Sequence, residues 1–175
     1  MKIKIIDKNG FFDNLEFFRK NLGLCFNYDD IEYLKKVDES VTNETLTQKC
    51  EEVCERVFNS YKKYFEKEDL ESFVVIACDD EKIYALVTFE REKDSVWYID
   101  AVTSRIEARR KGLASLCLKK GIEKIQSNCC LHVRKDNLPA ISLYRKLGFV
   151  KNDKPIFDVE NSYFLVKNYE KKWEQ

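Results

Sequence analysis

The spacing of hydrophobic residues divides the chain into a helical first third and a strand-rich remainder. Apolar positions recur at helical intervals over residues 11–22, 31–37 and 42–65, after a short predicted strand at 2–7. The longest of these predicted helices has a charged side opposite its apolar side, which is typical of a helix packed on a core. Its apolar side carries Leu46, Val53, Val57, Tyr61 and Tyr64.

From residue 73 onward, alternating and β-branched segments predict strands. Residues 73–77, 83–89 and 96–102 predict an antiparallel meander, with tight turns at Asp79-Asp80 and at 93–95. Residues 112–127 predict an amphipathic helix and 130–133 a strand. A second helix follows, capped by Asn137 and ended by Gly148. With a last strand at 163–166 and a charged tail, this order predicts an α+β (α/β) fold, a sheet covered by helices.

Composition and charge narrow the class of protein. The chain has 175 residues, of which 44% are hydrophobic, so we expect one globular domain over residues 1–175. Its 31 basic and 31 acidic residues give zero net charge, which argues against a nucleic-acid partner. It has no apolar stretch near the roughly 20 residues of a membrane helix and no signal-peptide core, which predicts a cytoplasmic protein without a membrane partner. Monomer and homodimer both remain open.

The cysteines indicate reduced thiols. Seven are present, an odd number without a C-x-x-C motif, beside a single histidine. This pattern fits neither a disulfide framework nor a zinc site, so we expect no metal.

A basic turn is the first candidate for chemistry. Between Arg105 and Lys120 lie six basic residues and one acid. The turn precedes a predicted helix, whose free N–H groups and dipole attract an anion. Gly112 lets the backbone approach a phosphate, and the small side chain of Ala114 avoids a clash. The segment therefore predicts a pyrophosphate site, with a solvated helix start as the alternative.

Two segments resemble the signatures of the GNAT N-acetyltransferase superfamily. Arg109-Arg110-Lys111-Gly112-Leu113-Ala114 is similar to its coenzyme A motif, Arg/Gln-x-x-Gly-x-Gly/Ala. Asn137 and residues 140–149 are similar to a second motif, Asn and a small residue followed by Leu-Tyr-x-x-x-Gly-Phe. The resemblance covers residues 73–150 well. It implies the GNAT fold, a central mixed, mostly antiparallel sheet flanked by helices, with a cofactor cleft between two splayed strands. Residues 1–70 would form the acceptor side and 71–170 the sheet and coenzyme A side.

The resemblance also implies roles for individual residues, with acetyl-CoA as cosubstrate. Backbone groups of Ala101, Val102 and Thr103 would pair with the pantetheine arm like an additional strand. The pyrophosphate would be cradled by Arg109, Arg110, Lys111, Gly112, Leu113, Ala114 and Ser115. Asn137 would bond the pantetheine, Tyr144 would lie near the thioester sulfur, and Arg145 or Lys146 would meet the outer phosphates. The seven residues from Val102 to Arg109 exceed the usual family spacing, so either this loop bulges or the strand end is displaced.

Direct acetyl transfer to an amine requires an acid and a base. Tyr144 is the candidate acid, because a phenol with a pKa near 10 is protonated at neutral pH. Strand alternation places Val96, Tyr98, Asp100 and Val102 on one face. Asp100 is the carboxylate there, either the base or the group that binds the substrate ammonium, and Tyr98 is a further catalytic candidate. His132 is a packed core histidine or an alternative base.

The resemblance implies a small-molecule or peptide amine as the acceptor. The long helical segment before the first motif offers room for an acceptor pocket, which favours a small-molecule amine. Acetylation of protein N-termini or lysines is the alternative. A coenzyme A-binding module without catalysis is the alternative from another functional class.

Overall fold

The computed structural model describes residues 1–92 and 95–169, in which seven strands form one sheet of order β1-β2-β3-β4-β5-β7-β6. The strands β4 and β5 are parallel and all other neighbours are antiparallel, so the expected mixed, mostly antiparallel sheet is confirmed. The strands are Lys2–Ile6 (β1), Leu70–Cys78 (β2), Ile83–Glu92 (β3), Trp97–Ser104 (β4), Cys129–Arg134 (β5), Val150–Lys151 (β6) and Ser162–Lys167 (β7).

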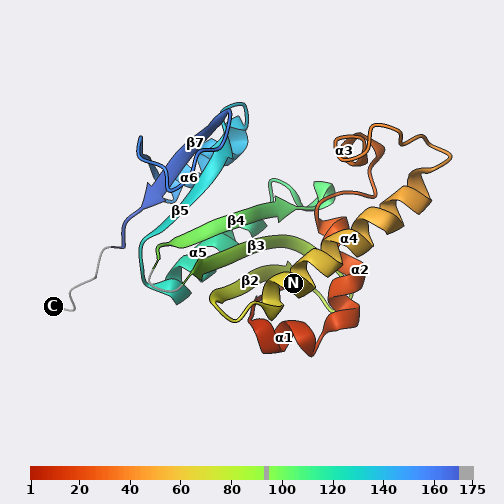
Figure 1. Cartoon of the computed structure of the whole chain (residues 1–175), viewed down its shortest axis with the longest axis horizontal. Coiled ribbons are helices and arrows are strands. Elements are labelled where there is room, and N and C mark those ends of the chain that lie inside the picture. Colours follow the sequence, from red (N-terminus) through yellow and green to blue (C-terminus); the bar gives the residue numbers. More distant parts are fainter. Residues whose placement is uncertain (93–94, 170–175) are drawn as a thin grey trace.

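Helices cover both faces of this sheet (Figure 1). One face carries α1, α2 and α4, and the other carries α5 and α6. Their bounds are Lys8–Phe12 (α1), Leu15–Cys25 (α2), Ile31–Leu34 (α3), Leu46–Glu66 (α4), Leu113–Ile125 (α5) and Leu138–Lys146 (α6), with a 3₁₀ turn at Ile106–Ala108. The predicted helix over 11–22 is thus two helices, and β6 was not predicted. The predicted turn at 93–95 and the predicted charged tail after residue 166 both fall partly outside the described residues.

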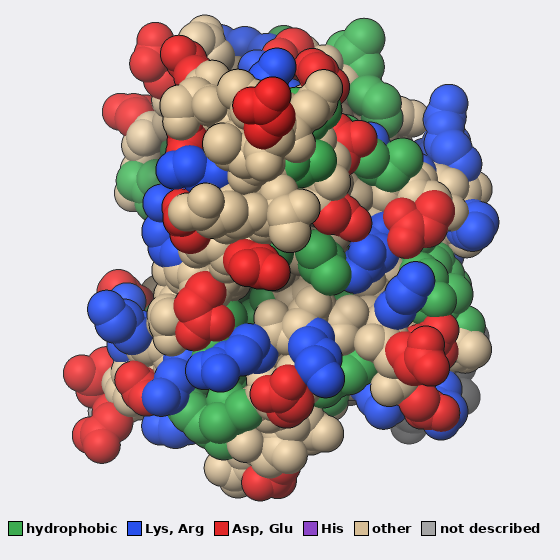
Figure 2. Space-filling view, turned by 90° about the vertical axis from the view of Figure 1, so that its right-hand side faces the viewer, with side chains coloured by type: hydrophobic (Ala, Val, Ile, Leu, Met, Phe, Trp, Pro, Cys, Tyr) green, Lys and Arg blue, Asp and Glu red, His purple; other side chains and the backbone are tan. Residues whose placement is uncertain are grey.

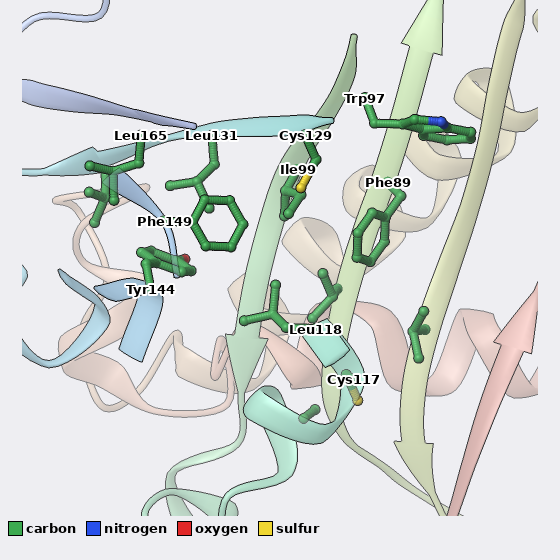
Figure 3. Close-up of a cluster of buried hydrophobic side chains, with 14 of the residues drawn as sticks. Phe89, Trp97, Ile99, Cys117, Leu118, Cys129, Leu131, Tyr144, Phe149 and Leu165 are labelled. Carbon is green, nitrogen blue, oxygen red and sulfur yellow. The ribbon is translucent and has the colours of Figure 1, made fainter. Parts of the chain in front are cut away.

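Two hydrophobic cores hold these layers together. On the α1, α2 and α4 face, the ring of Phe11 stacks on that of Phe65 at 4.6 Å and lies 4.8 Å from that of Phe18. On the other face, side chains of α5 and α6 interlock with those of β2–β5 and β7 (Figure 3). A Cβ on Gly121 would lie 2.1 Å from the ring of Phe89, so α5 lies unusually close to β3. This close packing fixes the second half of α5 relative to the sheet.

The strands β4 and β5 are paired over only a short length. Their ladder consists of Trp97 with Cys129 and Tyr98 with Cys130. Beyond these pairs the strands separate, and β5, β7 and α6 fan away from β2–β4 (Figure 1). The expected splayed strands are therefore present. The backbone of β4 from Ile99 to Ser104 has no strand partner on its β5 side among the described residues, and we call it the open edge of β4.

A β-bulge interrupts β4 beside this open edge. From Val87 to Phe89, β3 advances two residues while β4 advances three, from Val102 back to Ile99. Asp100 and Ala101 therefore share one position opposite β3. The extra length between Val102 and Arg109 is taken up by extension of β4 to Ser104 and by the 3₁₀ turn, and the bulge lies before this segment.

The bulge also changes which side chains share a face of β4. Ile99 packs into the core on the α5 face, and Ala101 packs on the opposite face. Val102 follows Ile99 onto the α5 face. The prediction that Val102 shares a face with Tyr98 and Asp100 is therefore wrong, because the extra residue reverses the alternation beyond it.

Candidate functional site

The basic turn adopts a backbone conformation that is unusual for its residues. Arg109 is extended, Arg110 has a φ of 64° and Gly112 has a φ of 76°. A positive φ in a bulky residue such as arginine is strained and persists where the surrounding structure enforces it. Both arginines, Lys111 and Gly112 are exposed, whereas the backbone amide of Arg109 donates to the carbonyl of Ile106 at 3.2 Å.

The turn ends at an uncapped helix start. Gly112 is the N-cap of α5 and, having no side chain, provides no capping group. The first helical hydrogen bond of α5 runs from the amide of Leu116 to the carbonyl of Gly112, at 3.0 Å. The N–H groups of Leu113, Ala114 and Ser115 precede it and are the unsatisfied donors of the first turn. With the helix dipole behind them, these amides can hold an anion such as a diphosphate.

Arg105 belongs to the protein interior. Its exposed fraction is 6%, and its Nε donates to the carbonyl of Ile83 at 3.0 Å. Its Nη1 lies 3.7 Å from a carboxylate oxygen of Asp29 and 3.9 Å from one of Glu107. Arg105 was one of the six basic residues counted around the turn in the sequence. In the structure it holds the loop after β4 together and is not available to an external anion.

On the α4 face of the sheet, two carboxylates lie on neighbouring strands. Asp100 lies in the bulge of β4, and Glu90 on β3 is the register partner of Tyr98. Partial desolvation raises the pKa of both carboxyl groups, although Asp100 is exposed at the surface and Glu90 half-buried, and the neighbouring Asp100 raises that of Glu90 further. Within residues 1–92 and 95–169, no lysine or arginine forms an ion pair with either carboxylate. The pair can therefore accept a proton or hold a cation.

Tyrosines of α4 surround these carboxylates. The hydroxyl of Tyr61 is 2.9 Å from that of Thr88, and burial raises its pKa. The hydroxyl of Tyr64 is buried without a hydrogen-bond partner among the described residues and lies near Glu90. Sequence reasoning did not single out Tyr61, Tyr64 or Glu90 as site residues. The sequence does contain a signal for Glu90. Alternation along β3 places this carboxylate on the face opposite to Val87 and Phe89, which is the face of Asp100.

Tyr98 connects β4 to β5 at the point where the strands separate. Its hydroxyl is 3.2 Å from Nδ1 of His132, and burial raises its pKa to about 12. The exposed ring of Phe157 covers both residues, with ring centroids 5.3 Å from Tyr98 and 4.7 Å from His132. Burial lowers the pKa of His132, whose Nε2 has no hydrogen-bond partner among the described residues. Histidine and tyrosine therefore form one neutral, hydrogen-bonded unit.

Tyr144 lies on the other side of the sheet, in the core formed with α5. It is 6% exposed and its ring packs edge-on against that of Phe149 at 5.8 Å, beside Leu131 (Figure 3). Burial raises its pKa, and the nearby Tyr98 raises it further. The two tyrosines thus approach the split between β4 and β5 from opposite faces.

The remaining predicted residues lie at the start and end of α6. Asn137 caps this helix, its Oδ1 accepting the amide of Ala140 at 3.3 Å, so its Nδ2 is the group left for a ligand. Arg145 and Lys146 lie in the last helical turn, at its outer surface. Ala101, Val102 and Thr103 form part of the open edge of β4, so the structure brings the basic turn and this edge together at the end of one strand.

A recess lies at the end of β4 that is remote from the basic turn. Its volume is about 580 Å³ and its lining includes Glu71, Arg91 and Trp97. Arg91 is already paired with Glu71 at 2.9 Å and stacks on Trp97. Arg91 and Glu71 therefore satisfy each other within the protein, and we assign no function to this recess. The face with the start of α4, shown in Figure 2, mixes blue and red side chains without a dominant charge.

Metal clusters and membrane-spanning helices are both missing from the described part of the chain. Within it, no three His, Cys, Asp or Glu side chains are grouped so that they can hold a metal ion. No described helix combines the length and the apolar character that crossing a bilayer requires.

Comparison with known proteins places these features in a family. Residues 38–149 match the model of the acetyltransferase (GNAT) family. No curated protein sequence matches the chain. The fold is shared with the PaiA N-acetyltransferase of Thermoplasma acidophilum in complex with coenzyme A, at 15% identity and a TM-score of 0.59 over 97% of this chain and 100% of that chain.

Two other solved structures have the same fold. An acetyltransferase from Thermus thermophilus has a TM-score of 0.62 and 11% identity, covering 96% of this chain and 97% of that chain. The ribosomal-protein-S18-alanine N-acetyltransferase of Escherichia coli has a TM-score of 0.52 and 17% identity, covering 67% of this chain and 79% of that chain.

We expect the imidazole of His132 to titrate below pH 6.5 and to be mainly neutral at pH 7. Burial lowers its pKa because it removes water from the charged form. The chain has one histidine, so an NMR pH titration of its ring protons reports on His132 alone. The variant Tyr98→Phe removes the 3.2 Å partner and should alter the ring nitrogen shifts. A pKa above 6.5 in the wild-type protein would contradict this expectation.

Proposed function

Because the chain belongs to the acetyltransferase (GNAT) family, we propose that it transfers the acetyl group of acetyl-coenzyme A to a primary amine, with a small-molecule amine as acceptor. One observation carries the proposal: the uncapped start of α5 and the open edge of β4 lie at the same end of one strand. The first suits a diphosphate and the second suits an extended chain with amide groups, and coenzyme A contains both.

The residues of the turn and of β4 fit this cosubstrate. The amides of Leu113, Ala114 and Ser115 are proposed to bind the pyrophosphate, with Arg109, Arg110 and Lys111 adding positive charge. The backbone of Ala101, Val102 and Thr103 is proposed to pair with the pantetheine arm as a strand would. This placement directs the thioester into the split between β4 and β5, where Tyr98 and Tyr144 approach from opposite faces.

We propose Tyr144 as the group that assists the leaving thiolate. The amine nitrogen attacks the acetyl carbon, a C–N bond forms and the C–S bond breaks. Burial raises the pKa of Tyr144, so its phenol is protonated at neutral pH and can donate a hydrogen bond to the sulfur.

The proton lost by the amine is assigned to Asp100, directly or through water. A carboxylate with a raised pKa is a better base than one in free solution, while it remains able to bind an ammonium group. Glu90, on the same face, is the second candidate. The neutral His132 and its partner Tyr98 are proposed to line the acceptor side.

The acceptor side is proposed to comprise residues 1–70 of a single domain over residues 1–175. The helices α2 and α4 cover the face on which Asp100 and Glu90 lie, and Phe157 adds an apolar surface beside Tyr98. The unpaired carboxylates favour an amine that arrives as an ammonium ion. A peptide amine remains the alternative acceptor, and a module that binds coenzyme A without turnover is the alternative activity.

The cofactor site is tested by replacing Gly112. We expect Gly112→Asp to weaken coenzyme A binding by roughly a hundredfold, because it places a negative charge beside the diphosphate. No protein atom lies within 4 Å of a Cβ at this position, and Asn and Asp tolerate a positive φ, so Gly112→Asn is the matched neutral control. Calorimetry with coenzyme A measures both. Equal affinities would remove the turn from the site.

The same variants test the function as a whole. Wild-type protein is incubated with acetyl-coenzyme A and a panel of small amines and peptide N-termini, and thiol release is followed. Turnover with a small amine that Gly112→Asp abolishes supports the proposal. Turnover only with peptides selects the alternative acceptor, and tight binding without any turnover selects the non-catalytic module.

We expect Tyr144→Phe to lower kcat by roughly tenfold to a hundredfold. Its affinity for coenzyme A should stay within about twofold of wild type, because the ring still packs on Phe149. Tyr163→Phe, at a half-buried tyrosine on β7, is the control for loss of a phenol. An unchanged kcat would show that Tyr144 serves only as a core residue.

The base is tested by comparing Asp100→Asn with Glu90→Gln. We expect Asp100→Asn to lower kcat/KM by roughly a hundredfold at neutral pH. In the wild type, kcat/KM should rise with pH as the base loses its proton, and because partial desolvation raises the pKa of Asp100, this rise should come at a higher pH than for a carboxyl group in free solution. Asp100→Asn should remove the rise and Glu90→Gln should keep it. The reverse result would assign the base to Glu90.

A further inference from the structure

The corner between α2 and α3 holds the loop that connects β4 to the basic turn. The side chain of Asn27 bonds this loop twice: its Nδ2 donates to the carbonyl of Ser104 at 3.1 Å, and its Oδ1 accepts the amide of Ile106 at 2.7 Å. We propose that Asn27 is a positioning residue for coenzyme A binding, which acts by holding this loop. The inference rests on the proposed function and adds a residue that has no contact with the turn itself.

The conformation of Asn27 is specific to this task. It follows the last turn of α2 with a φ of 63°, and its amide bonds the carbonyl of Leu24 at 3.0 Å. Asparagine tolerates this left-handed conformation better than most residues other than glycine. Its exposed fraction is 4%, so its carboxamide is shielded from water and both ends of the amide are satisfied by the loop.

The loop depends on such contacts because its own strand pairing has ended. The ladder between β3 and β4 stops where Ser104 faces Ala85, and the amide of Arg105 makes one more bond to the carbonyl of Tyr84. Asn27 then bonds the backbone on both sides of Arg105. Without these bonds, the segment up to Arg109 would be held by the 3₁₀ turn and by the Arg105 side chain.

Neighbouring contacts attach the same corner to both ends of the loop. Before the loop, the hydroxyl of Thr103 donates to the carbonyl of Cys25 at 2.9 Å. After it, the guanidinium of Arg109 lies over the ring of Tyr33 in α3, 5.0 Å from its centroid. Helices α2 and α3 therefore fix the distance between the open edge of β4 and the amides of α5. Coenzyme A must span this distance if its arm and its pyrophosphate bind as proposed.

The experiment separates the hydrogen bonds from the backbone conformation. Asn27→Gly keeps access to a positive φ but removes both bonds, and Asn27→Asp keeps the acceptor for Ile106 while losing the donor to Ser104. Asn161→Gly is the matched control, because Asn161 also has a positive φ, of 53°, and precedes β7 on the other arm of the sheet. Coenzyme A affinity is measured by calorimetry, with thermal unfolding and steady-state kinetics beside it.

We expect Asn27→Gly to weaken coenzyme A binding by about tenfold or more, from the loss of two buried hydrogen bonds. Asn27→Asp should lie between it and wild type. The KM for acetyl-coenzyme A should rise in parallel, while kcat at saturation and the KM for the amine stay within about twofold. Asn161→Gly should bind as wild type does.

Two results would overturn the inference while leaving the function intact. One is wild-type affinity in both Asn27 variants when Gly112→Asp has lost binding. The other is a fall in thermal stability and kcat with the affinity unchanged, which is the signature of a purely structural residue. If Asn27→Gly does not fold, Asn27→Asp decides between the same outcomes. Failure of the wild-type protein to bind coenzyme A would instead refute the proposed function.

Discussion

The short ladder between β4 and β5 is the constraint on which the rest of the structure depends. These two strands are parallel, so a crossover must connect them, and α5 is its main element. A crossover helix begins where the first strand ends, which places the uncapped start of α5 at the end of β4. Because the ladder stops after Tyr98, the same end of β4 has a free edge. One topological fact thus brings together the two features that fit coenzyme A.

The two halves of this arrangement are fixed by different kinds of contact. On one face, α5 is set by close packing, with Gly121 against the ring of Phe89. On the other, α2 is attached through buried amides. Asn21 accepts the amide of Ile83 at 3.1 Å and donates to the carbonyl of Glu81 at 3.0 Å, and Asn27 bonds the loop after β4. The position of α5 therefore depends on side-chain packing, and that of the loop after β4 depends on directional hydrogen bonds.

Much of the fold could be predicted because it is encoded locally. The meander, the helix after Gly112 and the cap at Asn137 each follow from residues close in sequence, and their predicted bounds shift by only a few residues. The bulge in β4 has no comparable local signal, since it depends on the register with β3, and it moved Val102 to the other face. The contacts of Arg105 and Asn27 join residues far apart in sequence. Their roles are therefore visible only in the folded chain.

The cysteines have a practical consequence for enzymology. Five of the seven thiols are buried and the other two partly so, and burial raises the pKa of each, to about 12 for Cys25 and about 11 for Cys130. Disulfide reagents react with the thiolate and need access to the sulfur. The folded protein should therefore react slowly with a chromogenic disulfide. The background rate of a thiol-release assay that uses such a reagent should be low and steady. A sudden increase in this background rate would show that the protein has unfolded during the assay, because unfolding exposes the buried thiols.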